Sequence, residues 1–246
     1  MCKSNIISKS AHIDSSVKLG VNNVIENNVV IKGNVIIGDN NYFASGTTIG
    51  GASRQRLRPA KWDPSPKSDG QILIGNNNLF FESVNIRKAM MEKTIIENNV
   101  SIGAHTHVGH DSIIRSNTII SINISLGGYT IIGHSSNIGM GVCIHPRCVI
   151  GSYTMCGMGA IIKGHVLPAL TVFGVPAKSK KINRIGLKRY GFSESEIINL
   201  DNMYRHRGKY SNTEKIDFKE FYSDCNKWKK NNLNIKYIYL ELKSNE

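Results

Sequence analysis

Aliphatic residues recur at every sixth position over much of this 246-residue chain, and this period restricts the possible folds more than any other feature. The longest run begins at Ile96 and ends at Ile162, with Cys156 in one of the aliphatic places, and an earlier run covers residues 13–49. Four residues after each aliphatic residue comes a small or β-branched one, such as Thr106. One bulky and one compact inward side chain in every six residues fit a narrow prism of stacked coils, in which no single repeat buries its own apolar face. The period therefore predicts a parallel β-helix built from hexapeptide repeats.

The hexapeptide period is interrupted twice. From Gly51 to Gly70 the chain carries three arginines and three prolines, a composition typical of a loop. Hexads resume at Ile74, so this segment is predicted to be an excursion loop over about residues 51–70. A shorter excursion follows Ile86. Elsewhere Gly, Asn and Asp separate the aliphatic residues, and these types tolerate the positive φ angles that repeated tight turns require.

The repeat map predicts a β-helix domain over residues 1–177 and a small α-helical region over residues 178–246. The motif Gly174-Val175-Pro176-Ala177-Lys178 is predicted to close the β-helix. From Ile96 the register is expected to hold as far as Pro168.

Helical periodicity begins in the C-terminal region. Ser193 and Glu196 form a capping box that predicts the start of a helix, and Gly208 is expected to end it. A second amphipathic helix is predicted from Lys215 to Lys230, and residues 231–246 fit no element.

Composition limits the expected cellular location of the protein and the classes of partner that it could bind. No run approaches the roughly 20 apolar residues of a membrane span, and the first residues do not resemble a signal peptide. Five cysteines without a CxxC motif are typical of reduced thiols, so a cytoplasmic protein is expected. The net charge of +13 favours an acidic partner such as a sugar nucleotide, CoA or an acidic carrier protein. No nucleic-acid-binding module is recognisable, so no nucleic-acid partner is expected.

Residues that are three hexads apart should stack on successive rungs about 4.8 Å apart, which allows the sequence to be read in columns. His110 then lies under Gly128, and Gly109 lies under Gly127. A solvated turn is the ordinary interpretation of any one polar residue at such a corner. Titratable side chains converging beside bare glycine backbone are typical of a functional site. The residues gathered at this edge are His110, Asp111, Tyr129, His145, Arg147 and His165.

His110 has suitable chemistry for a general base, and Asp111 is a carboxylate next to it in sequence. The two side chains meet only if the chain turns at this point. Gly128 offers a backbone N–H to an oxyanion and lets a ligand approach closely.

Several motifs resemble the UDP-N-acetylglucosamine acyltransferases of lipid A biosynthesis over roughly residues 10–210. They are His105-Thr106-His107-Val108-Gly109-His110-Asp111, Gly127-Gly128, the segment from Gly139 to His145, and Gly186-Leu187-Lys188-Arg189-Tyr190-Gly191-Phe192-Ser193. The resemblance implies a left-handed β-helix, a homotrimer with active sites between subunits, and transfer of an acyl group from a thioester to a sugar hydroxyl. It also implies that acyl carrier protein or CoA is a co-substrate and that no cofactor is bound.

The resemblance assigns roles to individual residues. It implies that His110 is the base, Asp111 its orienting partner and Gly128 the oxyanion donor. His107 and His145 would be neighbouring contacts, and Asn183 and Arg189 match positions that hold the uridine nucleotide.

The chain departs from the family pattern at several places. Tyr129 replaces a second groove histidine and is expected to contact substrate in its place, and Pro146 replaces a glutamine. Ile185 and Tyr190 replace a glutamate and an arginine of the nucleotide-binding segment. In the excursion loop Arg56 replaces an aspartate that contacts acyl group or sugar, so Arg56 and Arg58 are expected to contact substrate.

The closing motif is closer to that of acetyl-CoA-dependent sugar acetyltransferases, whose pantetheine arm runs along this end of the coil. Gly174, Lys178 and Lys180 are therefore expected to contact the donor. Three alternatives stay open: an acetyl-CoA-dependent N-acyltransferase of a nucleotide-linked amino sugar for surface polysaccharide, a γ-type carbonic anhydrase, and a non-catalytic scaffold. The carbonic anhydrase alternative lacks a histidine between His12 and His105, so no metal site is predicted.

Overall fold

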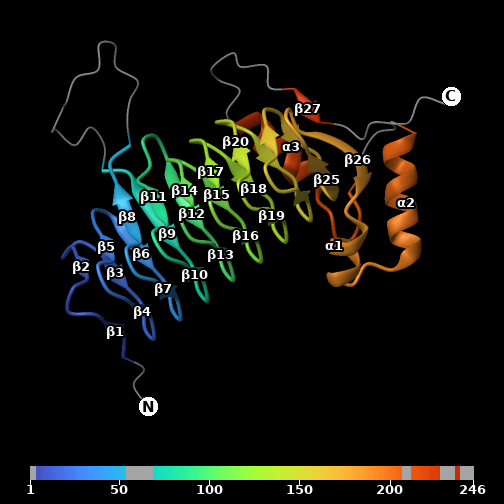
Figure 1. Ribbon diagram of the computed structural model, residues 1–246. Helices are drawn as coiled ribbons and strands as arrows, with labels where there is room; N and C mark the ends of the chain where they lie inside the picture. The colour runs from blue at the N-terminus through green and yellow to red at the C-terminus, as the bar shows by residue number, and fades with distance from the viewer. Residues whose placement is uncertain (1–3, 54–68, 207–211, 228–235, 239–246) are drawn as a thin grey trace, which may run out of the picture.

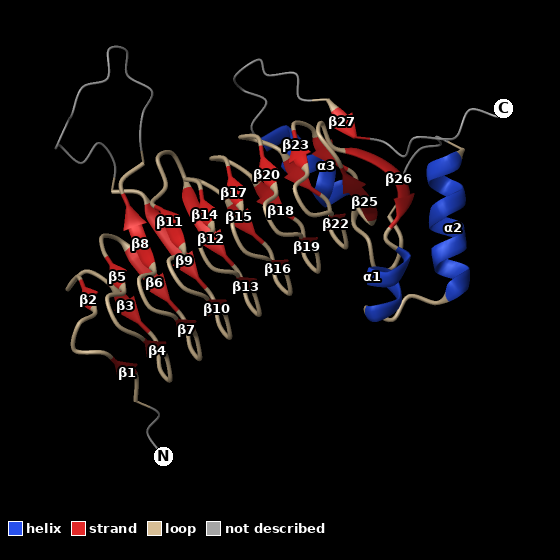
Figure 2. Cartoon of the chain, in the orientation of Figure 1, coloured by secondary structure: helices blue, strands red, loops and turns tan. Residues whose placement is uncertain are grey.

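The computed structural model describes residues 4–53, 69–206, 212–227 and 236–238. These residues form a long prism of stacked coils, with helices α1 (Arg184–Arg189), α2 (Glu194–Arg205) and α3 (Phe218–Lys227) at its C-terminal end (Figure 1). Strands line the prism, α1 and α2 lie at that end, and α3 lies against the strands (Figure 2). The fold is the predicted left-handed parallel β-helix with a small helical C-terminal region. No described helix is long and apolar enough to cross a membrane.

Three parallel sheets, here called A, B and C, form the three faces of the prism. Each coil contributes one short strand to each sheet, and aligned strands are generally three hexads apart in sequence, as for His107 and Ser125. Sheet A contains β1 (Ile6–Ile7), β4 (Val24–Ile25), β7 (Tyr42–Phe43), β10 (Leu79–Phe80), β13 (Ser101–Ile102), β16 (Ile119–Ile120), β19 (Asn137–Ile138), β22 (Met155–Cys156), β25 (Leu170–Phe173) and β26 (Lys178–Ile182).

Sheets B and C complete the coils. Sheet B contains β2 (His12–Ile13), β5 (Val30–Ile31), β8 (Thr48–Gly51), β11 (Asn85–Arg87), β14 (His107–Val108), β17 (Ser125–Leu126), β20 (Cys143–Ile144) and β23 (Ile161–Ile162). Sheet C contains β3 (Lys18–Leu19), β6 (Val35–Ile37), β9 (Gln71–Ile74), β12 (Lys93–Ile96), β15 (Ile113–Ile114), β18 (Ile131–Ile132), β21 (Val149–Ile150), β24 (His165–Val166) and β27 (Tyr237–Ile238).

From Ile25 onward the hexad aliphatic residues point inward and are almost completely buried, including Cys156 at 0% exposure, whereas Ile13 and Leu19 in the first coil are partly buried. At the corners the chain turns through positive φ angles, often at asparagines such as Asn99 and Asn117. Both observations confirm the predicted coil geometry. The described part of the first excursion lies between β8 and β9, and Arg56 and Arg58 lie outside the described residues.

The last coil is shorter than the others, and the expected register up to Pro168 is wrong. Ile150 pairs with Val166 and Met155 pairs with Thr171, so partners are two positions closer in sequence than three hexads would place them. The C-terminal strand β27 then pairs with β24, through His165 and Tyr237. Gly164 permits this approach, because an added Cβ would lie 2.5 Å from the carbonyl oxygen of Lys236.

The C-terminal region covers the end of the prism. Strand β26 pairs antiparallel with β25, so residues Lys178–Ile182 belong to a sheet rather than to a helix. Helix α2 begins with the predicted capping box, whereas Gly208 lies outside the described residues. Helix α3 begins at Phe218 rather than at Lys215.

Helix α3 is attached to sheet C through both apolar and charged contacts. Its buried residues include Phe218 and Phe221, and it contacts β21. Arg115, just after β15, is ion-paired with Asp224 at 2.7 Å and with Glu220 at 2.9 Å. The helix therefore follows the outer face of sheet C.

The aromatic pair Phe43 and Phe80 provides a test of the core. Their rings are stacked at 4.7 Å between centroids inside the prism, whereas the neighbouring Phe81 is 38% exposed. We expect Phe80→Ala to lower the free energy of unfolding by about 3–5 kcal/mol, because it leaves a cavity between rungs. Phe81→Ala should change it by about 0.5 kcal/mol or less. Urea unfolding measures both, and equal effects would contradict the inward position of Phe80.

Candidate active site

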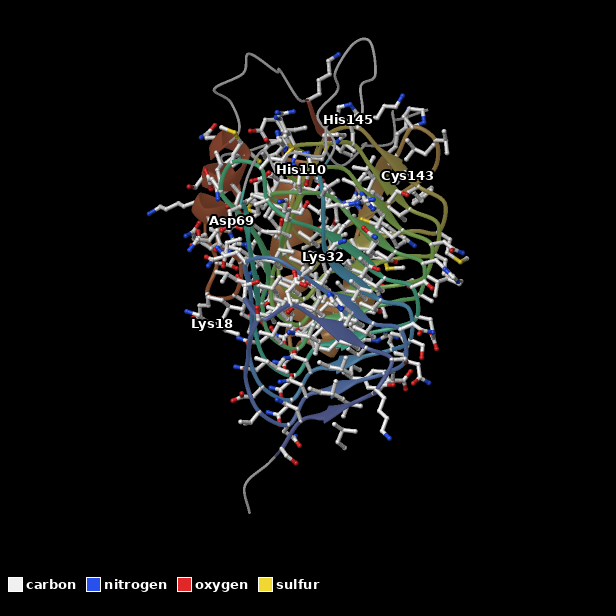
Figure 3. The ribbon with its side chains drawn as sticks, turned by 90° about the vertical axis from the view of Figure 1, so that its left-hand side faces the viewer. Lys18, Lys32, Asp69, His110, Cys143 and His145 are labelled. Carbon is white, nitrogen blue, oxygen red and sulfur yellow. The ribbon has the colours of Figure 1, made fainter. Side chains whose placement is uncertain are left out.

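A groove of about 540 Å³ follows the outer face of sheet B along the corner where the chain passes from sheet B to sheet C. Its floor is a ladder with one residue per rung, formed by His107, Ser125, Cys143 and Ile161. Figure 3 shows His110, Cys143 and His145 together in the upper part of the view, and all three line this groove.

His110 and Asp111 form a hydrogen-bonded pair at this corner. The imidazole Nδ1 of His110 lies 2.8 Å from Oδ2 of Asp111. The chain turns here, because Asp111 has a φ of +57°, and this brings the consecutive side chains together. The carboxylate is completely buried, whereas the imidazole is 23% exposed and lines the groove. With Nδ1 occupied by Asp111, Nε2 is the nitrogen available to a ligand.

A loop over residues 88–92, here called the clamp loop, supplies the other partners of Asp111. The backbone N–H of Met90 donates to Oδ2 at 2.9 Å, and those of Met91 and Glu92 donate to Oδ1 at 2.9 and 2.7 Å. Burial raises the pKa of Asp111, but the hydrogen bonds from His110 and from the three amides outweigh it and hold this pKa below its usual value. The pair is therefore an imidazole beside an ionised carboxylate.

The clamp loop is also tied to helix α3. Lys227 Nζ lies 2.9 Å from a carboxylate oxygen of Glu92, and both side chains are partly exposed. An exposed ion pair contributes about 0.2–1 kcal/mol, whereas a hydrogen bond to a charged group contributes about 1.5–3 kcal/mol. The amides, rather than the ion pair, therefore fix the position of Asp111.

Gly128 stands directly above the imidazole of His110. A Cβ at this position would lie 2.6 Å from Nε2 of His110. Any side chain at residue 128 would therefore displace the imidazole from its present position. Within the described residues the N–H of Gly128 has no hydrogen-bond acceptor. An N–H donor and a basic nitrogen therefore share one small space, which suits a reaction that develops negative charge on an oxygen.

Two further histidines line the same groove. His107 is half-buried, and burial, together with the charge of Arg87 and the nearby imidazole of His110, lowers its pKa, which favours its neutral form. His145 is exposed, and its Nδ1 lies 3.0 Å from the carbonyl oxygen of Pro146. Both imidazoles are available to bind a polar ligand beside His110.

Tyr129 lies beside the pair but does not line the groove. Its ring meets the imidazole of His110 edge-on at 4.8 Å, and the guanidinium of Arg147 covers its other side at 4.5 Å. Burial raises the pKa of its phenol, and the charge of Asp111 adds to this effect. Tyr129 therefore packs against His110 from outside the groove.

His165 does not belong to this edge of the prism. Because the last coil is short, His165 lies in β24, where its Nδ1 accepts a hydrogen bond from the backbone N–H of Val149 at 3.1 Å. It is 4% exposed, and its ring lies beside Tyr237. The column of stacked hexads placed it wrongly, since the final coil is two residues shorter than the coils before it.

Among the described residues no group of three or more His, Cys, Asp or Glu side chains is arranged to hold a metal ion. His105 lies at the corner between sheets A and B, whereas His110 lies at the corner between sheets B and C. Within one chain these two histidines therefore do not converge.

Two family models match parts of the chain. Residues 16–51 match the model for bacterial transferase hexapeptide repeats, and residues 166–226 match domain 2 of UDP-N-acetylglucosamine O-acyltransferase. The acyl-[acyl-carrier-protein]–UDP-N-acetylglucosamine O-acyltransferase of Saccharophagus degradans is 40% identical over 200 residues, which are 79% of this chain and 74% of that relative. The chain belongs to the UDP-N-acetylglucosamine O-acyltransferase family. It is therefore an acyltransferase.

Further proteins that carry this enzyme name are also similar to the chain. The relative from Stutzerimonas stutzeri is 32% identical over 139 residues, about half of each chain. The solved UDP-N-acetylglucosamine acyltransferase of Bacteroides fragilis is 27% identical, with 90% of both chains covered and a TM-score of 0.72. The enzyme from Campylobacter jejuni, at 21% identity and a TM-score of 0.74, shares the fold.

The segment that was expected to hold the nucleotide lies on another edge of the prism. Asn183 caps α1 by accepting a hydrogen bond from the backbone N–H of Gly186, and its amide donates to the carbonyl oxygen of Tyr153. Tyr190, just after α1, donates to the carbonyl oxygen of Asn117. These contacts are at the corner between sheets C and A. Arg189, in the last turn of α1, is exposed there, so one chain does not bring it to His110.

The closing motif lies at the C-terminal end of the groove. The backbone N–H of Ile161 donates to the carbonyl oxygen of Gly174, and Ala177 donates back to Ile161. Gly174 has a φ of +92° and forms the turn between β25 and β26. Lys178 is exposed at the start of β26, and Lys180 lies within this strand. The motif is thus continuous with the groove floor.

Some residues at the site were not anticipated from sequence. The groove also contains Arg87, Ser125 and Lys163, and the clamp loop binds Asp111. Continuing the column of His107 by three hexads at a time would have found Ser125 and Cys143. No sequence signal indicated that the amides of the clamp loop point at Asp111.

The buried carboxylate predicts a pH dependence of stability. Because the pKa of Asp111 is lowered on folding, its contribution is present above the unfolded value of about 3.9 and is lost as pH falls through the folded value. We expect Asp111→Asn to lower the free energy of unfolding by about 2 kcal/mol or more at pH 7, since the amide donors face a neutral group. Urea unfolding of both proteins from pH 7 to pH 3 should show this difference shrinking. A difference that is constant over this range would contradict an ionised, hydrogen-bonded Asp111.

Proposed function

We propose that this chain transfers an acyl group from the thioester of an acyl carrier protein to a hydroxyl group of UDP-N-acetylglucosamine. The observation that carries the proposal is the imidazole of His110, bonded to a buried carboxylate and lying against the backbone of Gly128 in a groove. Family membership supports the acyl transfer, and the names of the relatives support this donor and this acceptor.

The reaction is a direct transfer. Nε2 of His110 takes the proton of the acceptor hydroxyl as its oxygen attacks the thioester carbonyl, and the N–H of Gly128 donates to the developing oxyanion. The carbon–sulfur bond then breaks, and the proton passes from His110 to the departing sulfur. Asp111 holds the imidazole with Nε2 toward the substrate and stabilises the imidazolium.

Cys143 is an exposed thiol in the groove, and a covalent acyl-enzyme on its sulfur is the competing mechanism. Its Sγ makes a weak contact with the carbonyl oxygen of Gly141 at 4.0 Å. A nucleophilic thiol ordinarily has a base within hydrogen-bond reach, and a carbonyl oxygen is not such a base. The arrangement therefore supports direct transfer.

The alternatives are less well supported. The amino-sugar N-acyltransferase is not favoured, because the relatives carry the name of an O-acyltransferase. CoA as donor and substrate contacts from Arg56 and Arg58 stay predictions. The cytoplasmic location and the homotrimer also stay predictions.

Thiol release by the purified protein tests the proposal. We expect turnover with 3-hydroxyacyl carrier protein and UDP-N-acetylglucosamine, and much less with acetyl-CoA or with a UDP-linked amino sugar. His110→Ala should reduce turnover by about 10² to 10⁴-fold, the usual contribution of a general base. Turnover only with acetyl-CoA and the amino sugar would contradict the proposed substrates.

Matched variants separate the mechanisms. His12→Ala changes an exposed histidine in the first coil and should leave turnover unchanged. A loss of less than tenfold in His110→Ala would contradict the general-base role. If Cys143→Ser lost as much activity as His110→Ala, the covalent mechanism would replace direct transfer.

The separation of His110 from Arg189 supports an active site shared between subunits of the predicted homotrimer. If each site takes His110 from one subunit and Arg189 from the next, His110→Ala and Arg189→Ala chains should complement each other. Random trimers made from equal amounts of the two inactive variants should recover about one quarter of the sites, because half of the subunits supply each intact residue. Sedimentation gives the oligomeric state. A mixture as inactive as its components would contradict the shared site.

A further inference from the structure

The clamp loop is an insertion into the coil at one particular corner. Phe80 pairs with Ile102, and Asn85 pairs with His107, so this coil is longer by four positions than three hexads. The next coil returns to three hexads, since Ile95 pairs with Ile113. The four extra residues fall between β11 and β12, at the corner between sheets B and C. They therefore lie one rung below His110 and Asp111.

The donors around Asp111 saturate its carboxylate. Oδ1 accepts the backbone N–H groups of Met91 and Glu92, and Oδ2 accepts that of Met90 together with Nδ1 of His110. A carboxylate has about four acceptor sites, so each oxygen has two donors and no place is left for water. The orientation of the carboxylate is fixed by the clamp loop, and the orientation of the imidazole follows from it.

Thr94 ties the clamp loop to the backbone of Asp111. Its side chain is completely buried. Its Oγ1 donates to the carbonyl oxygen of Arg87, at the start of the loop, at 3.0 Å. The same oxygen accepts the backbone N–H of Asp111 at 2.9 Å. One hydroxyl thus closes the loop and holds the corner on which the carboxylate stands.

We propose that the clamp loop is a positioning element for the dyad of His110 and Asp111, and that Thr94 is its positioning residue. The inference deepens the proposed function and rests on the role of His110 as the base. Thr94 and the loop act through Asp111 and do not touch the substrate. Their contribution is the tautomer and direction of the imidazole, which decide whether Nε2 is free to take a proton.

Other charged groups near the dyad do not replace the clamp loop. Glu92 projects its side chain toward Lys227, and Arg147 stacks on Tyr129. Arg87 donates to the carbonyl oxygen of Ala52. Within the described residues, the hydrogen bonds to the carboxylate of Asp111 come from the clamp loop and His110.

Threonine variants test the proposal. Thr94→Val removes the hydroxyl and nearly keeps the shape, and Thr94→Ser restores the hydroxyl. We expect kcat/KM to fall by about 10- to 100-fold in Thr94→Val, mostly through kcat, because a small misplacement of a catalytic group costs on this scale. Thr94→Ser should stay within about threefold of the unmodified protein.

Thr118 provides the matched control. It is also completely buried, and its Oγ1 donates to the carbonyl oxygen of Gly133 at the corner between sheets C and A. Thr118→Val loses one buried hydrogen bond away from the groove, whereas Thr94→Val loses two. Thr118→Val should therefore be destabilised less than Thr94→Val in thermal unfolding and should resemble the unmodified protein in kcat/KM. An equal loss of kcat/KM in the two variants would reduce Thr94 to a structural role and overturn the proposal.

A spectroscopic measurement without substrate separates this inference from the proposed function. With ¹⁵N-labelled histidine, and the His110 signals assigned by their loss in His110→Ala, we expect a single tautomer protonated at Nδ1. Thr94→Val should give a mixture of tautomers, and Thr94→Ser a single one. An unchanged tautomer in Thr94→Val would overturn the inference. Absence of acyl transfer in the unmodified protein, with the tautomers as expected, would instead contradict the proposed function alone.

Hydrogen exchange keeps the inference testable if Thr94→Val does not fold. In the unmodified protein the amides of Met90, Met91 and Glu92 should exchange at least about 100-fold more slowly than unprotected amides, because each is bonded to a buried carboxylate. In Asp111→Asn they should exchange faster, while the amide of Gly133, bonded to Ile150, should not change. Exchange of the three amides at the unprotected rate in the unmodified protein would overturn the inference.

Discussion

Each rung of this prism is buried only by the rungs above and below it, and the whole structure depends on that stacking. An inward aliphatic residue such as Ile138 has no other cover, so its coil must stay in register with both neighbours. Register fixes the corners as well as the core. His110 comes to lie under Gly128 because both occupy the same place in successive coils, and the missing Cβ of Gly128 leaves room for the imidazole. The geometry of the site is thus a consequence of how the core is packed.

A regular coil cannot provide everything that the site needs. Burying the carboxylate of Asp111 is unfavourable unless donors surround it, and in a regular rung the strand N–H groups are already engaged with the neighbouring coil. The four additional residues of the clamp loop release three amides from that pattern and direct them at Asp111. The insertion therefore supplies the free backbone N–H donors that a regular coil lacks, and it supplies them one rung from His110.

The sequence was sufficient for the features that follow from periodicity. The hexads predicted the stacked coils, the columns predicted the contact of His110 with Gly128, and Ser193 with Glu196 predicted the start of α2. Prediction from periodicity failed at the last coil, where a distant segment of the chain occupies the position of a further coil. His165 was placed in the wrong column because β27, far along the chain, pairs beside it and the last coil is short. The clamp loop could be recognised as an interruption of the hexads. The direction of its backbone N–H groups could not be predicted, because it does not depend on the identity of the side chains.

The residues around the dyad also determine which charges change near neutral pH. Where the family pattern has a second groove histidine, this chain has Tyr129, covered by Arg147. A histidine there would titrate close to neutral pH, whereas the pKa of Tyr129 is raised by burial and by Asp111, and a guanidinium stays charged. The hydrogen bonds to Asp111 lower the pKa of its carboxyl, and burial lowers the pKa of His107. Burial and the charge of Asp111 thus favour the neutral phenol of Tyr129, so tyrosine in place of histidine removes one titration from the site without removing the ring that packs against the imidazole.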